Sequence, residues 1–423
     1  MEQVDLLIHS ANQLCPIPDH NGPQRGEALG DLGLIEDGAI AVHEGKIMAV
    51  GSSADIQARY AGELVLDARG RTVIPGFVDP HTHLPWFGDR ASEFEMRLAG
   101  ATYMDIMNAG GGIMSTVRQT RSASLDDLVQ NNLRRLAFML RHGTTSAETK
   151  TGYGLDTETE LKQLDAILAL NQLQAVELSP TFLPAHAIPE EYRGRTDAYV
   201  DLVVQEMLPA GQAWSQRHQQ PLFADVFCEA GVFDVPQTRR ILEKAKALGF
   251  GLKVHADEFE GLGGTALAVE LGAVSADHLV RTPDSDIRAL GDSGTVAVGL
   301  PGTPFGLGHH DYTPAQKILA AGGALALATD CNPGTCWCES MQMVLALACR
   351  YMKLTPAQAL VAATLNSAYA IGRGRDVGSL QPGKQADILI LDAPTYQHLG
   401  YRFGTNLVRT VIKKGRVMID DLA

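Results

Sequence analysis

The chain has 423 residues, of which 45% are hydrophobic and 20% charged, and its formal net charge is −14 at pH 7. This length and composition predict one large domain with a smaller addition. The acidic balance argues against a nucleic-acid partner, because no basic surface would neutralise phosphates.

The N-terminal residues lack the pattern of a signal peptide, and no apolar run reaches the roughly 20 residues of a membrane helix. The six cysteines show neither a disulfide framework nor a Cys-x-x-Cys pair. We therefore expect a protein of the reducing cytoplasm with no membrane partner.

The two ends of the chain share one pattern, in which short strand-like runs alternate with glycine turns. At the N-terminal end these runs cover residues 4–14, 35–51 and 64–70, and at the C-terminal end residues 378–392 and 406–420. We expect residues 1–72 and 378–423 to pair into one small β domain around a central body.

The central part, residues 73–377, alternates apolar runs with helical patterns such as Val235–Gly249 and Leu262–Gly272. Eight runs end in polar residues or glycine: residues 73–83, 143–150, 178–186, 222–231, 251–258, 273–279, 294–303 and 324–332. Eight such units predict an α/β fold with a closed (β/α)8 TIM barrel. A doubly wound open sheet is the alternative, although no Gly-x-Gly-x-x-Gly turn follows the first run.

Histidines and carboxylates gather at the ends of these predicted strands, where active sites of (β/α)8 barrels form. They are His81, His83, His186, His255, Glu258, His278 and Asp330. A single histidine at a strand end is more often a hydrogen-bonded core residue, but this joint pattern indicates a metal site. Several imidazoles with one carboxylate suit a divalent metal such as zinc or iron.

Glu258 follows His255 by three residues. There it would be able to pass a proton from a metal-activated water to a leaving nitrogen. A solvated loop carboxylate is the alternative interpretation.

These motifs resemble the amidohydrolase superfamily, through "PGFVDPHTH", "VHADE", "ADH" and "ATDCNPG". Longer segments resemble the imidazolonepropionase family, among them "KTGYGLD", "PTFLPAHAIPEEY", "DVFCEAGVF" and "LPGTPFGLG". The resemblance covers nearly the whole chain. It implies a metal-dependent TIM barrel with a small β-sandwich domain built from both chain ends, and a homodimer.

The resemblance also implies a site, residue by residue. The metal ligands fall on His81, His83, His255 and Asp330. The fourth strand lacks the lysine that two-metal members of the superfamily carry, so we expect one ion, Zn²⁺ or Fe²⁺/Fe³⁺. Contacts to the small-molecule substrate fall on Arg90, Tyr153, His186, Glu258, Asn332, Gly334 and Thr335, and His278 matches the residue that polarises the carbonyl under attack.

The implied activity is hydrolysis of 4-imidazolone-5-propanoate to N-formimidoyl-L-glutamate in histidine degradation, by a metal-bound hydroxide. In this mechanism Asp330 orients the nucleophile, His278 stabilises the oxyanion and Glu258 protonates the departing nitrogen. Arg90 suits the propanoate, although a surface ion pair with a neighbouring acid is the plain alternative. Tyr153, between two glycines, is expected on a flexible loop.

Three alternatives stay open at this point. A deaminase of a nucleobase or related heterocycle would share the metal residues, although it would have no propanoate for Arg90 to bind. A non-catalytic barrel that serves as a scaffold is the second. A soft metal site at Cys336-x-Cys338 is the third, although this spacing favours ordinary thiols.

Overall fold

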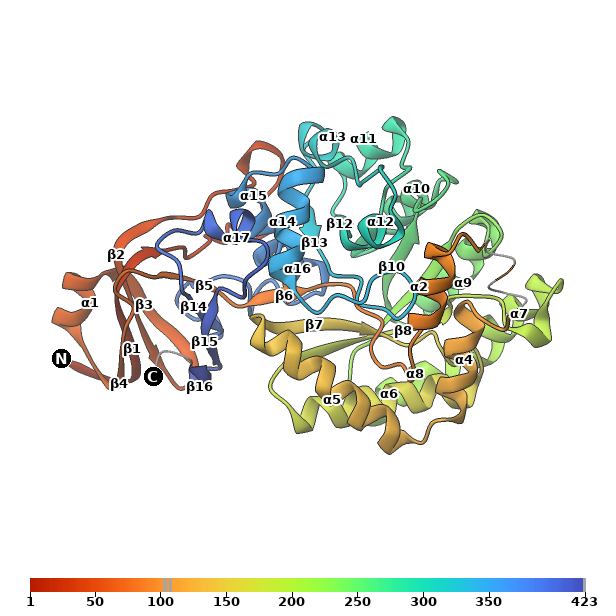
Figure 1. Ribbon diagram of the computed structural model, residues 1–423, viewed down its shortest axis with the longest axis horizontal. Coiled ribbons are helices and arrows are strands. Elements are labelled where there is room, and N and C mark those ends of the chain that lie inside the picture. Colours follow the sequence, from red (N-terminus) through yellow and green to blue (C-terminus); the bar gives the residue numbers. More distant parts are fainter. Residues whose placement is uncertain (102–104, 106–108, 421–423) are drawn as a thin grey trace.

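The computed structural model describes residues 1–101, 105 and 109–420. Both chain termini lie in a small β domain at one end of the molecule, and the large α/β body forms the rest (Figure 1). The chain builds most of the β domain first, passes through the whole α/β body and then returns to complete the sheet.

The sheet of the β domain is mixed and takes strands from both ends of the chain. Its hydrogen-bonded order is β16-β15-β14-β5-β1-β2-β3, with β4 paired to β1. The bounds are β1 Glu2–Leu14, β2 Ile35–His43, β3 Lys46–Ser52, β4 Tyr60–Asp67, β5 Thr72–Pro75, β14 Ile388–Leu391, β15 Val408–Lys413 and β16 Arg416–Asp420. Apolar side chains from the two ends, among them Ile8, Ile40, Ile388 and Ile412, form one buried cluster.

The first predicted strand of the barrel is in fact two strands in two sheets. β5 pairs with β1 and β14 in the β domain, and β6 (Phe77–Asp79) begins the barrel. Between them lies Gly76, where an added Cβ would sit 2.3 Å from Oγ1 of Thr145. This close approach requires glycine, at the point where the run passes from one sheet to the other. The domain bounds at residues 72 and 378 stay a prediction.

The barrel consists of eight parallel strands in the order β13-β12-β11-β10-β9-β8-β7-β6. Their bounds, besides β6, are β7 Thr144–Lys150, β8 Glu177–Ala185, β9 Phe223–Cys228, β10 Gly251–Ala256, β11 Ser275–His278, β12 Val296–Gly299 and β13 Leu325–Leu327. A parallel bridge between Thr82 and Cys331 joins the chain just after the first and last strands. The barrel prediction is confirmed, and the open sheet is excluded.

Helices surround the barrel (Figure 1). They are α2 Ala91–Leu98, α4 Ile113–Ser122, α5 Leu125–Arg141, α6 Thr157–Leu173, α7 Thr196–Leu202, α8 Leu208–His218, α9 Val235–Ala247, α10 Gly264–Leu271, α11 Asp284–Asp292, α12 Gly302–Leu307, α13 Ala315–Ala320, α14 Met341–Tyr351, α15 Pro356–Ala362 and α16 Leu365–Ala370. Two further short helices, α1 Ser53–Arg59 and α17 His398–Tyr401, belong to the parts of the chain before and after the barrel.

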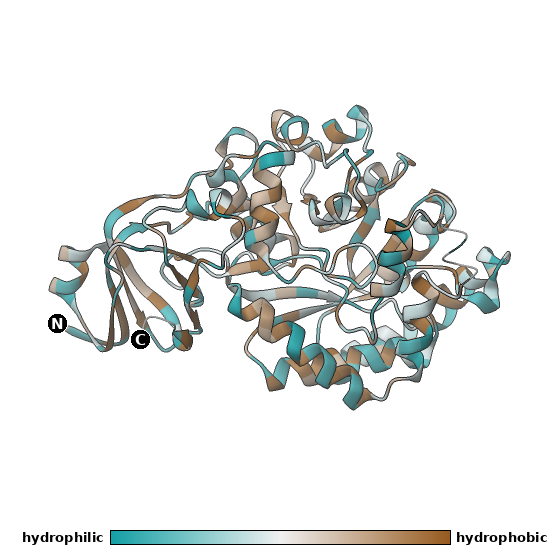
Figure 2. Ribbon diagram, in the orientation of Figure 1, coloured by the Kyte–Doolittle hydropathy of each residue, from teal (hydrophilic) through white to brown (hydrophobic). Residues whose placement is uncertain are grey.

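The outer helices have the local signals that their sequences predict. Capping boxes begin α5 at Ser124 and α9 at Asp234, where each side chain accepts the backbone N–H three residues on. Hydrophilic and hydrophobic residues alternate along these helices, as expected when one face packs on the barrel (Figure 2). The helical patterns at 235–249 and 262–272 correspond to α9 and α10.

In the described part of the chain, no helix combines the length and apolarity needed to cross a membrane. The six cysteines are all free.

Candidate active site

The site lies at the carboxyl ends of the barrel strands, where several residues adopt left-handed backbone conformations. His278 has φ 75°, Asp330 φ 55° and Asp257 φ 53°. Non-glycine residues rarely adopt this conformation, which costs on the order of 1–3 kcal/mol and gathers at functional sites. At β11, β13 and β10 the chain therefore turns sharply as the strand ends.

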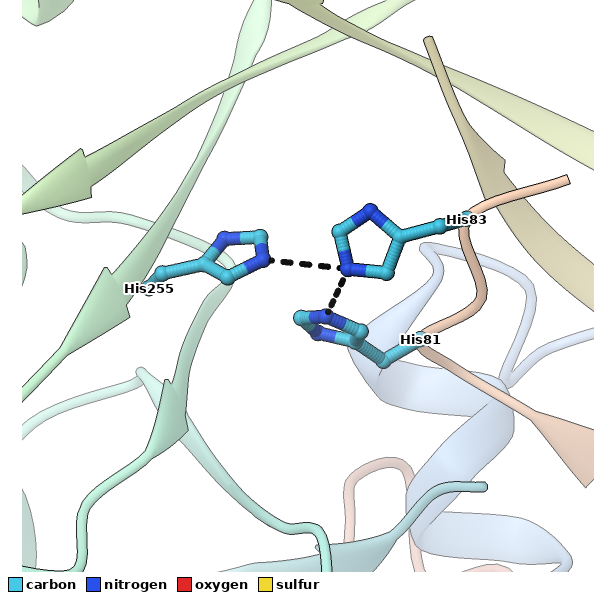
Figure 3. A group of neighbouring side chains, drawn as sticks. All are labelled: His81, His83 and His255. Carbon is cyan, nitrogen blue, oxygen red and sulfur yellow. Dashed lines mark hydrogen bonds between the residues drawn. The ribbon is translucent and has the colours of Figure 1, made fainter. Parts of the chain in front are cut away.

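Three imidazole rings converge on one point (Figure 3). Nε2 of His83 lies 3.2 Å from Nε2 of His81 and 3.4 Å from Nε2 of His255. Oδ1 of Asp330 lies 3.5 Å from Nε2 of His81 and 3.3 Å from Nε2 of His83. His255 lies on β10, His81 and His83 follow β6, and Asp330 follows β13. All four side chains are at most 3% exposed.

This arrangement fits a divalent metal ion. For a tetrahedral ion with bonds of about 2.0–2.1 Å, the ligand atoms stand about 3.3–3.4 Å apart, close to the four distances of 3.2–3.5 Å given above. The three Nε2 atoms form one compact group of possible ligands, and Asp330 stands beside His81 and His83. Oδ1 of Asp330 also has no hydrogen-bond partner among the described residues. A buried carboxylate oxygen without a partner is costly unless it binds a cation.

Two of the three histidines have a carboxylate behind them. Nδ1 of His81 lies 2.6 Å from Oδ2 of Asp277, and Nδ1 of His255 lies 3.0 Å from Oδ2 of Asp225. The contact with Asp277 is a hydrogen bond, which holds the proton of His81 on Nδ1 and leaves its Nε2 lone pair free for a metal. Nδ1 of His255 faces Asp225 at 3.0 Å without the geometry of a hydrogen bond. Burial lowers the pKa of His81 well below its ordinary value, which keeps the ring neutral.

Every other residue predicted for the site lines one cavity of about 130 Å³ beside this cluster. From the predicted set, the lining residues are His83, Arg90, Tyr153, His186, His255, Glu258, His278, Asp330, Asn332, Gly334 and Thr335. His81 does not line the cavity and is fully buried. The structure thus brings the expected residues together, while their individual roles stay predictions.

Arg90 stands at one side of the cavity, at the start of α2. Its Nε donates to Oγ1 of Thr116 at 2.9 Å. Among the described residues Arg90 forms no ion pair with a neighbouring acid, which was the alternative interpretation of this arginine. An added Cβ on Gly334 would lie 2.5 Å from Nη1 of Arg90. The guanidinium therefore packs against the loop that follows β13.

That loop is held by its own side chains. Oδ1 of Asn332 accepts the backbone N–H groups of Gly334 and Thr335, both at 2.8 Å, and its Nδ2 donates to Oγ1 of Thr335 at 2.9 Å. The three residues form a rigid turn at the mouth of the cavity.

Tyr153 lies on a short loop that is fastened rather than free, contrary to the expectation. The carboxylate of Glu160 on α6 accepts the backbone N–H groups of Gly152, Gly154 and Leu155. Tyr153 itself is 2% exposed. Ile113, the first residue of α4, also lines the cavity. The three glycines at 110–112 therefore lead into this helix beside the site.

Glu258 and His278 face each other across the cavity wall, with Oε2 of Glu258 3.6 Å from Nδ1 of His278. Burial, and then the charges of Asp330 and Glu229, raise the pKa of Glu258 well above its ordinary value. Burial lowers the pKa of His278 to about 3. Burial therefore favours the uncharged form of both groups, a carboxyl group able to donate a proton and a neutral imidazole.

Sequence reasoning missed several residues that support the site: Thr116, Glu160, Asp225, Glu229, Asp257 and Asp277. Asp225 and Asp277 are carboxylates inside short strands, and a charged residue in such a strand was the available signal. Asp257 accepts the backbone N–H groups that open α10, and Glu229 accepts those of Phe259 and Glu260. Together they fix the loop that presents Glu258.

Relatives of known name match nearly the whole chain. Imidazolonepropionases of Herpetosiphon aurantiacus, Chloroflexus aggregans and Symbiobacterium thermophilum are 55%, 51% and 50% identical, over 99–100% of this chain and 98–99% of theirs. Solved structures share the fold at low identity. They include an adenosine deaminase from Xanthomonas campestris with bound zinc (TM-score 0.73, 21% identity, covering 99% of this chain and 94% of that one) and the guanine deaminase of E. coli (TM-score 0.72, 16% identity, 98% of each chain).

The family model of the amidohydrolase family matches residues 72–418. This match, the full-length relatives and the histidine cluster at the barrel mouth agree with one another. The chain belongs to the imidazolonepropionase family of the amidohydrolases.

Proposed function

We propose that the protein hydrolyses 4-imidazolone-5-propanoate to N-formimidoyl-L-glutamate, a step of histidine degradation. The proposal rests on one cavity, which is lined both by histidines that are able to hold a metal ion and by Arg90. Arg90 is the one arginine or lysine among the described lining residues. A cavity with a metal site at one wall and a single guanidinium at another suits a cyclic amide that carries one carboxylate.

Arg90 binds the propanoate. A guanidinium offers two parallel N–H donors to a carboxylate, and the bond from Nε to Thr116 sets the direction of the group. The backbone and hydroxyl groups of Gly334 and Thr335 stand beside it in the turn that Asn332 fixes. Tyr153 and His186 line the same wall, with ring centroids 5.2 Å apart, and contact the imidazolone ring.

His81, His83, His255 and Asp330 hold one divalent ion, Zn²⁺ or Fe²⁺/Fe³⁺. When bound, such an ion polarises the ring carbonyl and lowers the pKa of a water to about 7. A single ion is supported by β9, which carries no lysine. Lys150 on β7, two strands away, is already paired with Glu148 and Asp225.

The proton transfers fall to side chains on the opposite wall. Asp330 accepts a hydrogen bond from Thr303 through Oδ2 and orients the attacking water through the other oxygen. His278 stabilises the charge that develops on the carbonyl oxygen. Glu258 donates a proton to the ring nitrogen as the C–N bond breaks, and water supplies the oxygen of the new carboxylate.

A deaminase would use the same metal residues, and the structural neighbours include deaminases. Their identity to this chain is at most 21%, so they support the fold alone. Arg90 favours a substrate with a carboxylate, which nucleobases lack. A cytoplasmic homodimer is a further proposal that rests on the family resemblance, and light scattering of the purified protein tests the dimer.

The deciding experiment mixes the purified protein with 4-imidazolone-5-propanoate and follows the loss of its ultraviolet absorbance, with and without a strong chelator. Rapid loss that the chelator suppresses supports both the substrate and the metal. No loss from metal-loaded protein contradicts the substrate assignment, and a panel of amino-heterocycles then tests the deaminase alternative. A protein that holds no metal and turns over nothing supports the scaffold alternative.

A further inference from the structure

A layer of charged side chains fills the barrel just beneath the histidine cluster. Its members lie on four strands, β7, β9, β10 and β11, and each is at most 1% exposed: Glu148, Lys150, Asp225, Lys253 and Asp277. Barrel interiors are ordinarily filled with branched apolar side chains. Charged groups are almost never fully buried unless they are paired, so this layer needs a specific reason.

Lys150 is the centre of the layer. Its Nζ lies 2.6 Å from Oε1 of Glu148, 2.8 Å from Oδ2 of Asp225 and 3.8 Å from Oδ2 of Asp277. The ammonium group therefore stands between two aspartates that come from β9 and β11.

Both aspartates use the same oxygen to contact a histidine of the cluster. Oδ2 of Asp277 is 2.6 Å from Nδ1 of His81, and Oδ2 of Asp225 is 3.0 Å from Nδ1 of His255. Asp225 is fixed further through Oδ1, which accepts the backbone N–H of His255 at 3.1 Å. One ammonium group thus joins the two carboxylates that orient two of the converging imidazoles.

We propose that Lys150 is a positioning residue for the metal, which holds Asp225 and Asp277 against the Nδ1 atoms of His255 and His81. With both carboxylates held, both Nε2 lone pairs point at the ion. Without the ammonium group two buried carboxylates face each other with less compensation, and a buried charge that loses its partner rearranges at large cost. The inference rests on the proposed metal site and adds to it a residue outside the ligands and their direct partners.

Lys253 is equally buried but has different contacts. Its Nζ donates to the carbonyl oxygens of Pro80 and Ala370 at 3.1 and 3.2 Å and lies 3.9 Å from Glu148. Its hydrogen bonds thus go to the backbone, whereas those of Lys150 go to the carboxylates of Glu148 and Asp225. Burial alone therefore does not explain the position of Lys150.

The test measures the dissociation constant for zinc by competition with a chelator of known affinity. It uses wild type, Lys150→Met, Glu148→Gln and the double variant Lys150→Met/Glu148→Gln. The double variant removes one positive and one negative charge, so it keeps the charge balance of the layer while it loses the bridge. Lys413→Met is the matched control, because Lys413 is 5% exposed and lies between Glu177 and Asp387, 2.8 and 2.7 Å away, outside this layer.

We expect the two Lys150 variants to bind zinc about 10- to 100-fold more weakly, as for other changes behind metal ligands. Glu148→Gln and Lys413→Met should stay within about threefold of wild type. The visible absorption bands of the cobalt-loaded protein should change in the Lys150 variants alone, because those bands report ligand geometry and not global stability. Circular dichroism checks that each variant is folded.

If Lys150→Met does not fold, the charge-balanced double variant decides. Unchanged zinc affinity and an unchanged cobalt spectrum in a folded Lys150 variant would overturn the inference and leave the proposed function in place. An equal loss of affinity in Lys413→Met would overturn it as well, because the effect would then follow stability. A wild-type protein that binds no zinc or iron would contradict the proposed metal site itself.

Discussion

Glu258 has an environment that sets it apart from an ordinary surface glutamate. Its side chain is 9% exposed beside His278, and burial raises its pKa, which favours the protonated form that a proton donor needs. We predict that Glu258→Gln lowers kcat by at least about 100-fold and leaves the metal content unchanged. Metal analysis and steady-state kinetics check this, with the exposed neighbour Glu260→Gln as control. Loss of metal in the variant would give Glu258 a structural role instead.

Arg90 is the group expected to bind the substrate carboxylate. A hydrogen bond to a charged group contributes about 1.5–3 kcal/mol. Arg90→Met should therefore raise KM about 10- to 100-fold, with a smaller change in kcat. Arg118→Met is the control, because Arg118 pairs with Glu190 at the surface. An analogue that lacks the carboxylate should be turned over equally by wild type and Arg90→Met, and a tenfold difference would contradict the assignment.

The residues that sequence reasoning found and those it missed differ in a physical way. His81 and His83 stand out because a strand end with two histidines on one face is unusual. Asp225 and Asp277 each look like an isolated charge inside a short strand, and Lys150 looks like the polar end of one. Their meaning depends on which strands are neighbours across the barrel, and periodicity along one strand does not contain that information.

At the scale of elements, the division of residues 73–83 into β5 and β6 has the same origin. The apolar pattern is continuous, and Gly76, where a side chain would clash with Thr145, lies between the strand that ends one sheet and the strand that begins the next. The other seven barrel strands were predicted within a few residues. Each of them is isolated by polar residues or glycines at both ends.

The contact between β8 of the barrel and the sheet of the β domain depends on Glu177. Its carboxylate lies 2.8 Å from Nζ of Lys413, 2.6 Å from Nζ of Lys414 and 3.0 Å from Nη1 of Arg373. Although partial burial opposes ionisation, these cations and the hydrogen bond from Gln385 hold the pKa of Glu177 below its ordinary value. Ionised Glu177 therefore connects the two parts of the molecule.

We predict that Glu177→Gln lowers the unfolding free energy by about 1–3 kcal/mol at pH 7. Since the pKa is lower in the folded protein, the contribution is full above the unfolded pKa of about 4.3. It declines as the pH falls below that value toward the folded pKa. Denaturant unfolding of both proteins from pH 7 to pH 3.5 checks this. A constant difference across that range would contradict it, and Glu190→Gln at an exposed ion pair is the control.

At the scale of the whole molecule, the proposed metal ligands lie where the first and last strands of the barrel meet. His81 and His83 follow the first strand and Asp330 follows the last strand. The backbone N–H of Asp330 donates to the carbonyl of His81 at 3.1 Å, and that of His83 donates to the carbonyl of Cys331 at 3.0 Å. An ion held by these side chains would bind the two ends of the sheet to each other, so catalysis and barrel closure depend on the same few residues.

We therefore predict that metal removal destabilises the whole protein. A ligand that binds the folded state alone, at 100 times its dissociation constant, contributes about 2.7 kcal/mol. Chelated protein should unfold at a Tm several degrees lower than the metal-loaded form, and added zinc should restore the Tm. In His83→Asn the shift should largely disappear, because the variant lacks one ligand that joins the first strand to the last. A wild-type Tm that does not respond to the chelator, in protein shown by elemental analysis to have lost its metal, would mean that the hydrogen bonds between the two strands close the barrel by themselves.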